Sequence, residues 1–123
     1  MKSIGFLFML GLLAPAQKPV EIEVPEVAAS REDDKLTIDG RVKNVSAKPI
    51  RELKIIFEIL DSDKNVLTKQ STDSEEDLVE PGEEIEFHVQ MGFHARAVQV
   101  RLGFEDASGH ELRIGPLKPI MIE

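Results

Sequence analysis

The sequence predicts an all-β protein, an antiparallel β-sandwich of about seven strands. Two observations favour this fold class. Apolar and polar residues alternate through most of the chain after residue 17, which is the two-residue period of a half-buried strand. Clusters of Gly, Pro, Asn, Asp and Ser separate the alternating stretches, and no stretch keeps the period of a capped helix. A small barrel is the alternative way to bury the same apolar faces.

The first residues predict an export signal. Lys2 provides a positive start, residues 4–13 form an apolar run, and Ala14-Pro15-Ala16 has the small-x-small pattern of a signal-peptidase site. The run is too short to cross a bilayer comfortably. We therefore expect residues 1–16 to be a signal peptide and residues 17–123 to form a single domain that is secreted or periplasmic. An uncleaved anchor or a simple hydrophobic strand is the alternative interpretation.

Composition excludes several classes of protein. The chain contains no Cys, which excludes disulfides, thiol nucleophiles, Cys-rich zinc sites and a lipoprotein anchor. Its net charge of −8 argues against nucleic acid or an anionic membrane surface as a partner. We expect the partner to be another envelope or exported protein, with no membrane insertion after signal cleavage. The sequence leaves the oligomeric state open.

The predicted strands follow the alternation in chain order. Residues 51–60 could be mistaken for a helix, but their β-branched content and the Asp-Ser-Asp that follows favour a strand. A final strand covers residues 111–114 or continues through Ile122. The other expected strands cover residues 20–24, 36–43, 53–59, 66–70, 85–91 and 98–104.

The gaps between these strands carry turn chemistry. Pro81-Gly82 suits the two central positions of a type II turn, because Gly accepts a positive φ. Asn44, Ser46 and Asp61 have side chains that can bond local backbone where a strand meets a turn. The predicted turns cover residues 44–49, 61–65, 81–82 and 106–110.

Three motifs occur in order along the chain: GRVKNVSAKPI at 40–50, FEILD at 57–61 and LVEPGEEIEFHV at 78–89. Together they resemble the FxLYD domain, a small immunoglobulin-like module of exported bacterial and archaeal proteins. Ile59 and Leu60 stand where the family has its Leu and Tyr. The resemblance implies an immunoglobulin-like β-sandwich with a non-catalytic role, structural or protein-interaction, in the bacterial envelope or periplasm. It brings no catalytic motif.

Asp61, Asp63 and Asn65 are spaced like the first ligands of a calcium loop. An EF-hand needs Gly at its sixth position and Glu at its twelfth, where this chain has Val66 and Thr72, so an EF-hand is excluded. A looser cation site could recruit the acidic loop at residues 73–84, and a calcium- or cation-binding sandwich is therefore the alternative function. We expect a hairpin turn at 61–65 and a solvated loop at 73–84.

The histidines are the remaining candidates for acid–base chemistry. His88 lies on the outward face of its strand, whereas His94 and His110 lie in loops, and a hydrolase would need these two to converge at one end of the sandwich. The sequence has no G-x-S-x-G or S-x-x-K motif and no phosphate-binding glycine loop. We expect no enzyme and no cofactor, and the sequence nominates no catalytic, cofactor-binding or metal-binding residue.

Two apolar residues are expected on the outward face of a strand, where polar residues are usual. Ile56 and Leu60 fall on the outward face of their strand, where another segment covers them or they form a partner-binding patch. We expect cover. The candidate binding surfaces are therefore an exposed sheet edge or the loops at one end of the sandwich.

Overall fold

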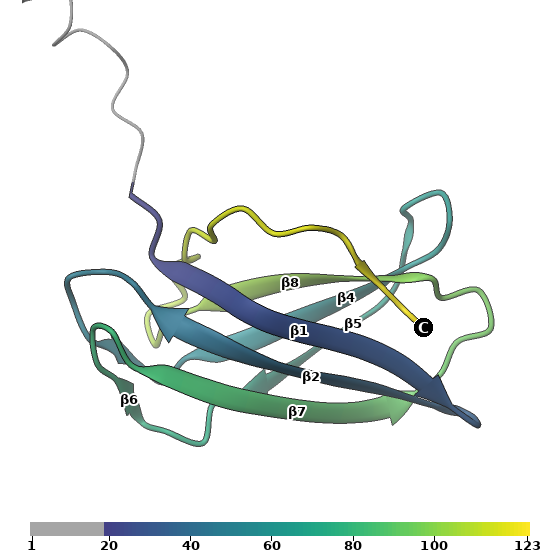
Figure 1. Cartoon of the computed structure of the whole chain (residues 1–123), viewed down its shortest axis with the longest axis horizontal. Coiled ribbons are helices and arrows are strands. Elements are labelled where there is room, and N and C mark those ends of the chain that lie inside the picture. Colours follow the sequence, from purple (N-terminus) through teal and green to yellow (C-terminus); the bar gives the residue numbers. More distant parts are fainter. Residues whose placement is uncertain (1–18) are drawn as a thin grey trace, which may run out of the picture.

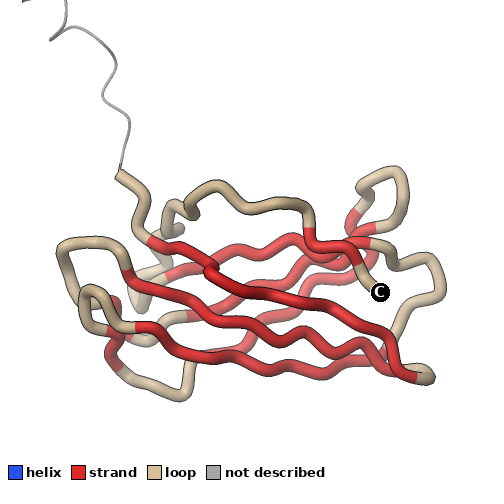
Figure 2. The backbone as a smooth tube through the Cα atoms, in the orientation of Figure 1, coloured by secondary structure: helices blue, strands red, loops and turns tan. Residues whose placement is uncertain are grey.

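The computed structural model describes residues 19–123, so the predicted signal peptide at residues 1–16 lies outside the described residues. Strands and connecting loops make up this part of the chain (Figure 2). Six strands are long and three are two-residue segments. The strands are β1 (Ile22–Glu32), β2 (Lys35–Asn44), β3 (Ile50–Arg51), β4 (Lys54–Leu60), β5 (Val66–Asp73), β6 (Leu78–Val79), β7 (Glu84–Gly92), β8 (Gln99–Glu105) and β9 (Ile120–Met121).

Two antiparallel sheets face each other (Figure 1). One has the order β1-β2-β7 and the other β5-β4-β8-β9, while β3 and β6 pair separately. The chain changes sheet between β2 and β4, between β5 and β7, and between β7 and β8. This order matches strands A, B and E against C′, C, F and G of an immunoglobulin-like sandwich. The predicted fold class is confirmed, and the sheets do not close into a barrel.

The core fills the space between the two sheets. The rings of Phe57 on β4 and Phe87 on β7 lie 5.9 Å apart at 54°, a tilted contact that joins the sheets. Gly40 on β2 makes room for this contact, because a Cβ there would lie 2.6 Å from Cζ of Phe87 and 2.7 Å from the carbonyl oxygen of Glu26. Most residues of the inward stripes expected from the sequence are buried, among them Leu36, Ile38, Val42, Ile55, Phe57 and Ile59. Val20, Val24, Val89 and Val98 are half-buried.

The first strand is longer than the expected residues 20–24. A register shift between Glu23 and Glu26 accommodates Pro25, and β1 then continues to Glu32 along β2. A tight turn at residues 33–34 closes this hairpin, with Asp33 in the left-handed region at φ 56°. The bulge hides the strand from sequence analysis because it shifts the alternation by one position.

The C-terminal segment also differs from the expectation. No regular strand covers residues 111–114, and the last strand is the two-residue β9. Instead, Ile114 forms an isolated parallel bridge with Ile22, and Ile122 forms one with Ala29. The segment therefore runs beside β1 and covers part of its outer edge (Figure 1).

The outward parity expected for Ile56 and Leu60 is kept. The extra residue of the bulge beside Leu60 lies on β5, and β4 keeps a regular register with β8 as far as the pair of Leu60 with Gln99. Leu60 is 1% exposed and lies outside the cluster of core residues, so it is covered, as expected. Ile56 lies on the same outer face and is half-buried. A Cβ placed on Gly103 of β8 would lie 3.7 Å from Cβ of Ile56, so this glycine leaves the isoleucine room.

Candidate functional site

The loops gather at two ends of the sandwich (Figure 1). One end, here called the loop end, is built from residues 45–49, 80–83 and 106–112. The opposite end carries the turns at residues 33–34, 61–65 and 93–98. His94 and His110 lie beyond opposite ends of β8, so the structure does not bring together the two histidines that a hydrolase would need.

Each histidine has its own local partner. His88 lies on the outer face of β7, and its Nδ1 is in hydrogen-bond contact with Oδ1 of Asp39 on β2. Nδ1 of His94 accepts a hydrogen bond of 3.1 Å from the backbone N–H of Arg96. Nε2 of His110 lies 3.7 Å from Oε2 of Glu21. Three histidines in three separate places form no shared acid–base pair.

The Asp61 side chain holds the β4–β5 turn together. Its Oδ1 accepts 2.9 Å hydrogen bonds from the N–H groups of Asp63 and Asn65. The bond from the Asn65 N–H lowers the pKa of the Asp61 carboxyl below its ordinary value, although burial acts in the other direction. The oxygen spacing that resembles a calcium loop therefore belongs to an Asx-type hairpin turn.

The acidic stretch at residues 73–84 lies far from this turn. Seven residues of β5, 66–72, separate the two segments, a span of roughly 25 Å at about 3.3 Å per residue. Within residues 19–123, no three Asp, Glu, His or Cys side chains gather closely enough to hold a metal ion. A cation site that combined the 61–65 turn with this acidic stretch would have to join segments at opposite ends of β5.

Asn44 organises the loop end. Its buried Nδ2 donates 2.9 Å hydrogen bonds to the carbonyl oxygens of Lys48 and Val79. Its Oδ1 accepts from the N–H and the hydroxyl of Ser46, at 2.9 and 2.7 Å. Gly82 N–H donates to the Asn44 carbonyl at 2.7 Å. One side chain and its backbone thus connect the residue 45–49 loop to β6 and to the Pro81-Gly82 turn.

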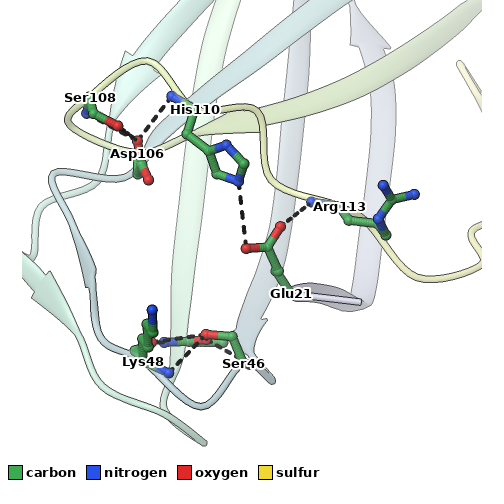
Figure 3. A network of polar contacts seen from close by, with 8 residues as sticks. Glu21, Ser46, Lys48, Asp106, Ser108, His110 and Arg113 are labelled. Carbon is green, nitrogen blue, oxygen red and sulfur yellow. Dashed lines mark hydrogen bonds and ion pairs between the residues drawn. The ribbon is translucent and has the colours of Figure 1, made fainter. Parts of the chain in front are cut away.

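A second polar network holds the other loop at this end (Figure 3). Oδ1 of Asp106 accepts bonds from the Ser108 hydroxyl at 2.8 Å and from the N–H groups of Ser108 and His110 at 3.0 Å. Burial raises the pKa of Asp106, but these hydrogen bonds outweigh it and leave the pKa below its ordinary value. Oε1 of Glu21 accepts from the Arg113 N–H at 2.9 Å, which ties the start of the described chain to this loop.

A hollow of about 480 Å³ lies between the two networks. The buried Leu112 lies among the lining residues, whereas Lys48 and Ala107 are exposed. Backbone and polar side chains of both loops supply hydrogen-bonding groups around it. The lining also includes Glu21, Ser46, Pro49, Ile50, Arg51, Asp106 and Ser108.

The local half of this site follows from the sequence alone. Asn44 and Ser46 are expected to bond nearby backbone, and they do. The bond from Asn44 to Val79, 35 residues away, and the contact between Glu21 and Arg113, 92 residues apart, are not predicted. No local pattern marks such contacts, because strand order rather than spacing brings these residues together.

Comparison with known proteins supports the fold. The sequence matches no protein-family model and no curated protein. A β-glucuronidase from glycoside hydrolase family 2 matches 83% of the chain at 11% identity, with a TM-score of 0.60. The C-terminal domain of wzt matches 85% of the chain and 79% of its own length at 8% identity, with a TM-score of 0.55. The putative ApaA protein from Bordetella pertussis matches 86% and 95% at 14% identity, with a TM-score of 0.53.

These likenesses show a shared fold and no more. The chain spans 13% of the length of the β-glucuronidase, so it is similar to one part of that enzyme. The other two structures are similar over most of their length. The chain therefore has the architecture of a small β-domain, which is compatible with a non-catalytic module, and its resemblance to the FxLYD family stays an expectation.

Proposed function

We propose that this protein is an exported, non-catalytic immunoglobulin-like module that binds another protein of the bacterial envelope or periplasm through its loop end. The observation that carries the proposal is the buried Asn44 side chain, which holds the loop at residues 45–49 against β6. Fixed loops on a rigid sandwich lose little conformational entropy when a partner binds. Binding residues are concentrated on such loops in other sandwiches.

Export is supported by the leader expected at residues 1–16 and by the resemblance to the FxLYD domain. The residues that carry the resemblance have physical roles in the fold. Gly40 makes room for Phe87, and Asn44 with Ser46 builds the first loop. Gly82, at φ 85°, adopts the left-handed conformation that the turn before β7 requires.

The chemistry of the loop end favours a polar partner. Most of its exposed side chains are small or polar, and the large apolar side chains of Leu112 and Ile50 are buried. Carboxylates predominate nearby, in residues 73–84 and at Glu21, Asp106 and Glu111. A basic face on the partner would complement this charge and would direct the encounter.

Affinity capture with matched variants tests the proposal. The full chain is expressed in a bacterial host, exported and used to capture proteins from envelope extract. The loop-end variant is K48E/A107R, and the control K64E/A95R makes the same changes at exposed residues of the opposite end. A protein captured by the native chain and the control but lost with the loop-end variant supports the proposal. Equal capture by both variants, or no capture by the native chain, contradicts it.

A further inference from the structure

Strand β5 lies at one edge of the four-stranded sheet. Within residues 19–123, β5 pairs only with β4. The Ser74 N–H donates a hydrogen bond of 2.9 Å to the Leu53 carbonyl, so the backbone groups of Ser74 and of every second residue before it face β4. Because successive residues of a strand direct their backbone groups to opposite sides, the N–H and C=O groups of Lys69, Ser71 and Asp73 face outward. A free row of this kind is a template for pairing with another strand.

The outer face of this sheet carries charges in alternating order. Register aligns three residues from β8, β4 and β5 in each row. The rows are Glu105-Lys54-Asp73, Gly103-Ile56-Ser71 and Arg101-Glu58-Lys69. The charges of the first row are negative, positive and negative, the second row is neutral, and the charges of the third row are positive, negative and positive. In the third row Arg101 donates a hydrogen bond of 2.7 Å to Glu58.

We propose that two copies of this protein associate edge to edge through β5, antiparallel about a twofold axis at Ser71. In this register Lys69 of each copy lies opposite Asp73 of the other, and Ser71 lies opposite Ser71. The three residues with outward backbone groups are the ones that pair. The two charged rows continue across the junction, each with six charges of alternating sign, and the four-stranded sheets join into one of eight strands.

The same charges disfavour other registers. A shift by two residues places Ser71 opposite Lys69 or opposite Asp73, depending on direction, and removes the pairs of Lys69 with Asp73. A shift by four residues places Lys69 opposite Lys69, or Asp73 opposite Asp73, depending on direction. Like charges directly opposite each other destabilise a strand pair. The edge therefore specifies one antiparallel alignment with itself.

The free edge of β7 lacks this complementarity. The Asn44 N–H bonds the Glu83 carbonyl, so the outward backbone groups of β7 belong to Glu84, Glu86, His88 and Gln90. In central antiparallel registers of β7 with a second copy, Glu86 lies opposite Glu86, His88 or Gln90, and the outward residues of β7 include no Lys or Arg to pair with it. Self-association through β5 is therefore favoured over self-association through β7.

This association goes beyond the proposed function and uses a different surface, so either can fail without the other. Sedimentation of the exported, purified chain over a range of concentrations measures it. We expect a reversible dimer for the native chain. Because two charge pairs become two repulsions, K69E and D73K should each raise the dimer dissociation constant roughly tenfold. E86K on the β7 edge is the matched control and should leave association unchanged.

Mixing the two variants provides the decisive result. A K69E chain has acids at both positions and a D73K chain has lysines at both, so the mixed pair restores two attractive contacts. We expect the mixture to dimerise at concentrations where each variant alone does not. S71P, which removes an outward N–H that β4 does not use, should leave the fold intact by circular dichroism and abolish the dimer. A native chain that stays monomeric at millimolar concentration overturns the proposal, as does a dimer that all three β5 variants leave unchanged.

Discussion

The side-chain amide of Asn44, at the end of β2, donates a 2.9 Å hydrogen bond to the backbone carbonyl of Val79 in β6. Both residues are fully buried. The same side chain is also hydrogen-bonded to Ser46 and Lys48, so four hydrogen bonds at the edge of the core depend on one residue. Local turn chemistry and the attachment of a distant strand are thus combined in a single asparagine.

Asn44→Ala should destabilise the fold by about 2–4 kcal/mol, because it leaves the buried Val79 carbonyl without its side-chain donor and removes the acceptor of Ser46. Urea unfolding measures the change. Asn44→Asp is the informative companion, since it keeps the acceptor for Ser46 and loses the amide donor, and it should be destabilising too. Ser46→Ala should cost about 1 kcal/mol. Equal, small effects for all three would argue against a central role for Asn44.

Gly40→Ala should destabilise the protein by about 1–3 kcal/mol. The new methyl group would meet the Phe87 ring and the Glu26 backbone, at 2.6 and 2.7 Å, and the strands would have to move apart. Gly92→Ala at the end of β7 is the control, because nothing lies within 4 Å of its Cβ position. Thermal unfolding of the two variants should separate them clearly, and similar melting temperatures would mean that the sheets yield easily at Phe87.

Asp61→Asn should lower the melting temperature at neutral pH and make stability less sensitive to acid. The folded-state pKa of Asp61 lies below its ordinary value of 3.8. Its carboxylate therefore stabilises the fold above that value, and the contribution is lost as pH falls through the lower folded-state pKa. The melting-temperature difference between native chain and variant should be constant above about pH 5 and should shrink towards pH 2. A difference that grows in acid would contradict this sign.

Calcium should not stabilise the protein. Oδ1 of Asp61 already accepts two backbone hydrogen bonds, and the acidic stretch lies at the other end of β5. A thermal melt with several millimolar calcium should shift the midpoint by less than about 1 °C relative to magnesium or to chelator. A rise of several degrees that D63N abolishes would restore the cation-binding alternative.

The sequence predicts the part of the fold that depends on alternation within one strand. Phe57, Ile59 and Phe87 lie on the inward faces expected from a two-residue period. Where a bulge shifts that period, the prediction is incomplete, as in β1 after Pro25. A bulge is stabilised by the neighbouring strand, which local sequence does not reveal.

In the candidate site, too, local contacts could be predicted from the sequence and long-range contacts could not. The turn built by Asp61 and the loop built by Asn44 and Ser46 could be predicted, because their bonds span two to four residues. The approach of Glu21 to His110 depends on which strands become neighbours. The separation of His94 from His110 depends on the direction of β8. Both are properties of topology, and spacing along the chain carries no signal for them.

Photo-crosslinking in living bacteria tests binding through the loop end most directly, because it captures a partner whose identity is still open. A photoreactive residue replaces Lys48 at the loop end, or Ser62 at the opposite end, and both positions are exposed. We expect a discrete crosslinked product with one envelope protein from position 48 and none from position 62. Crosslinks from position 62 alone, or none from position 48, would contradict binding through the loop end.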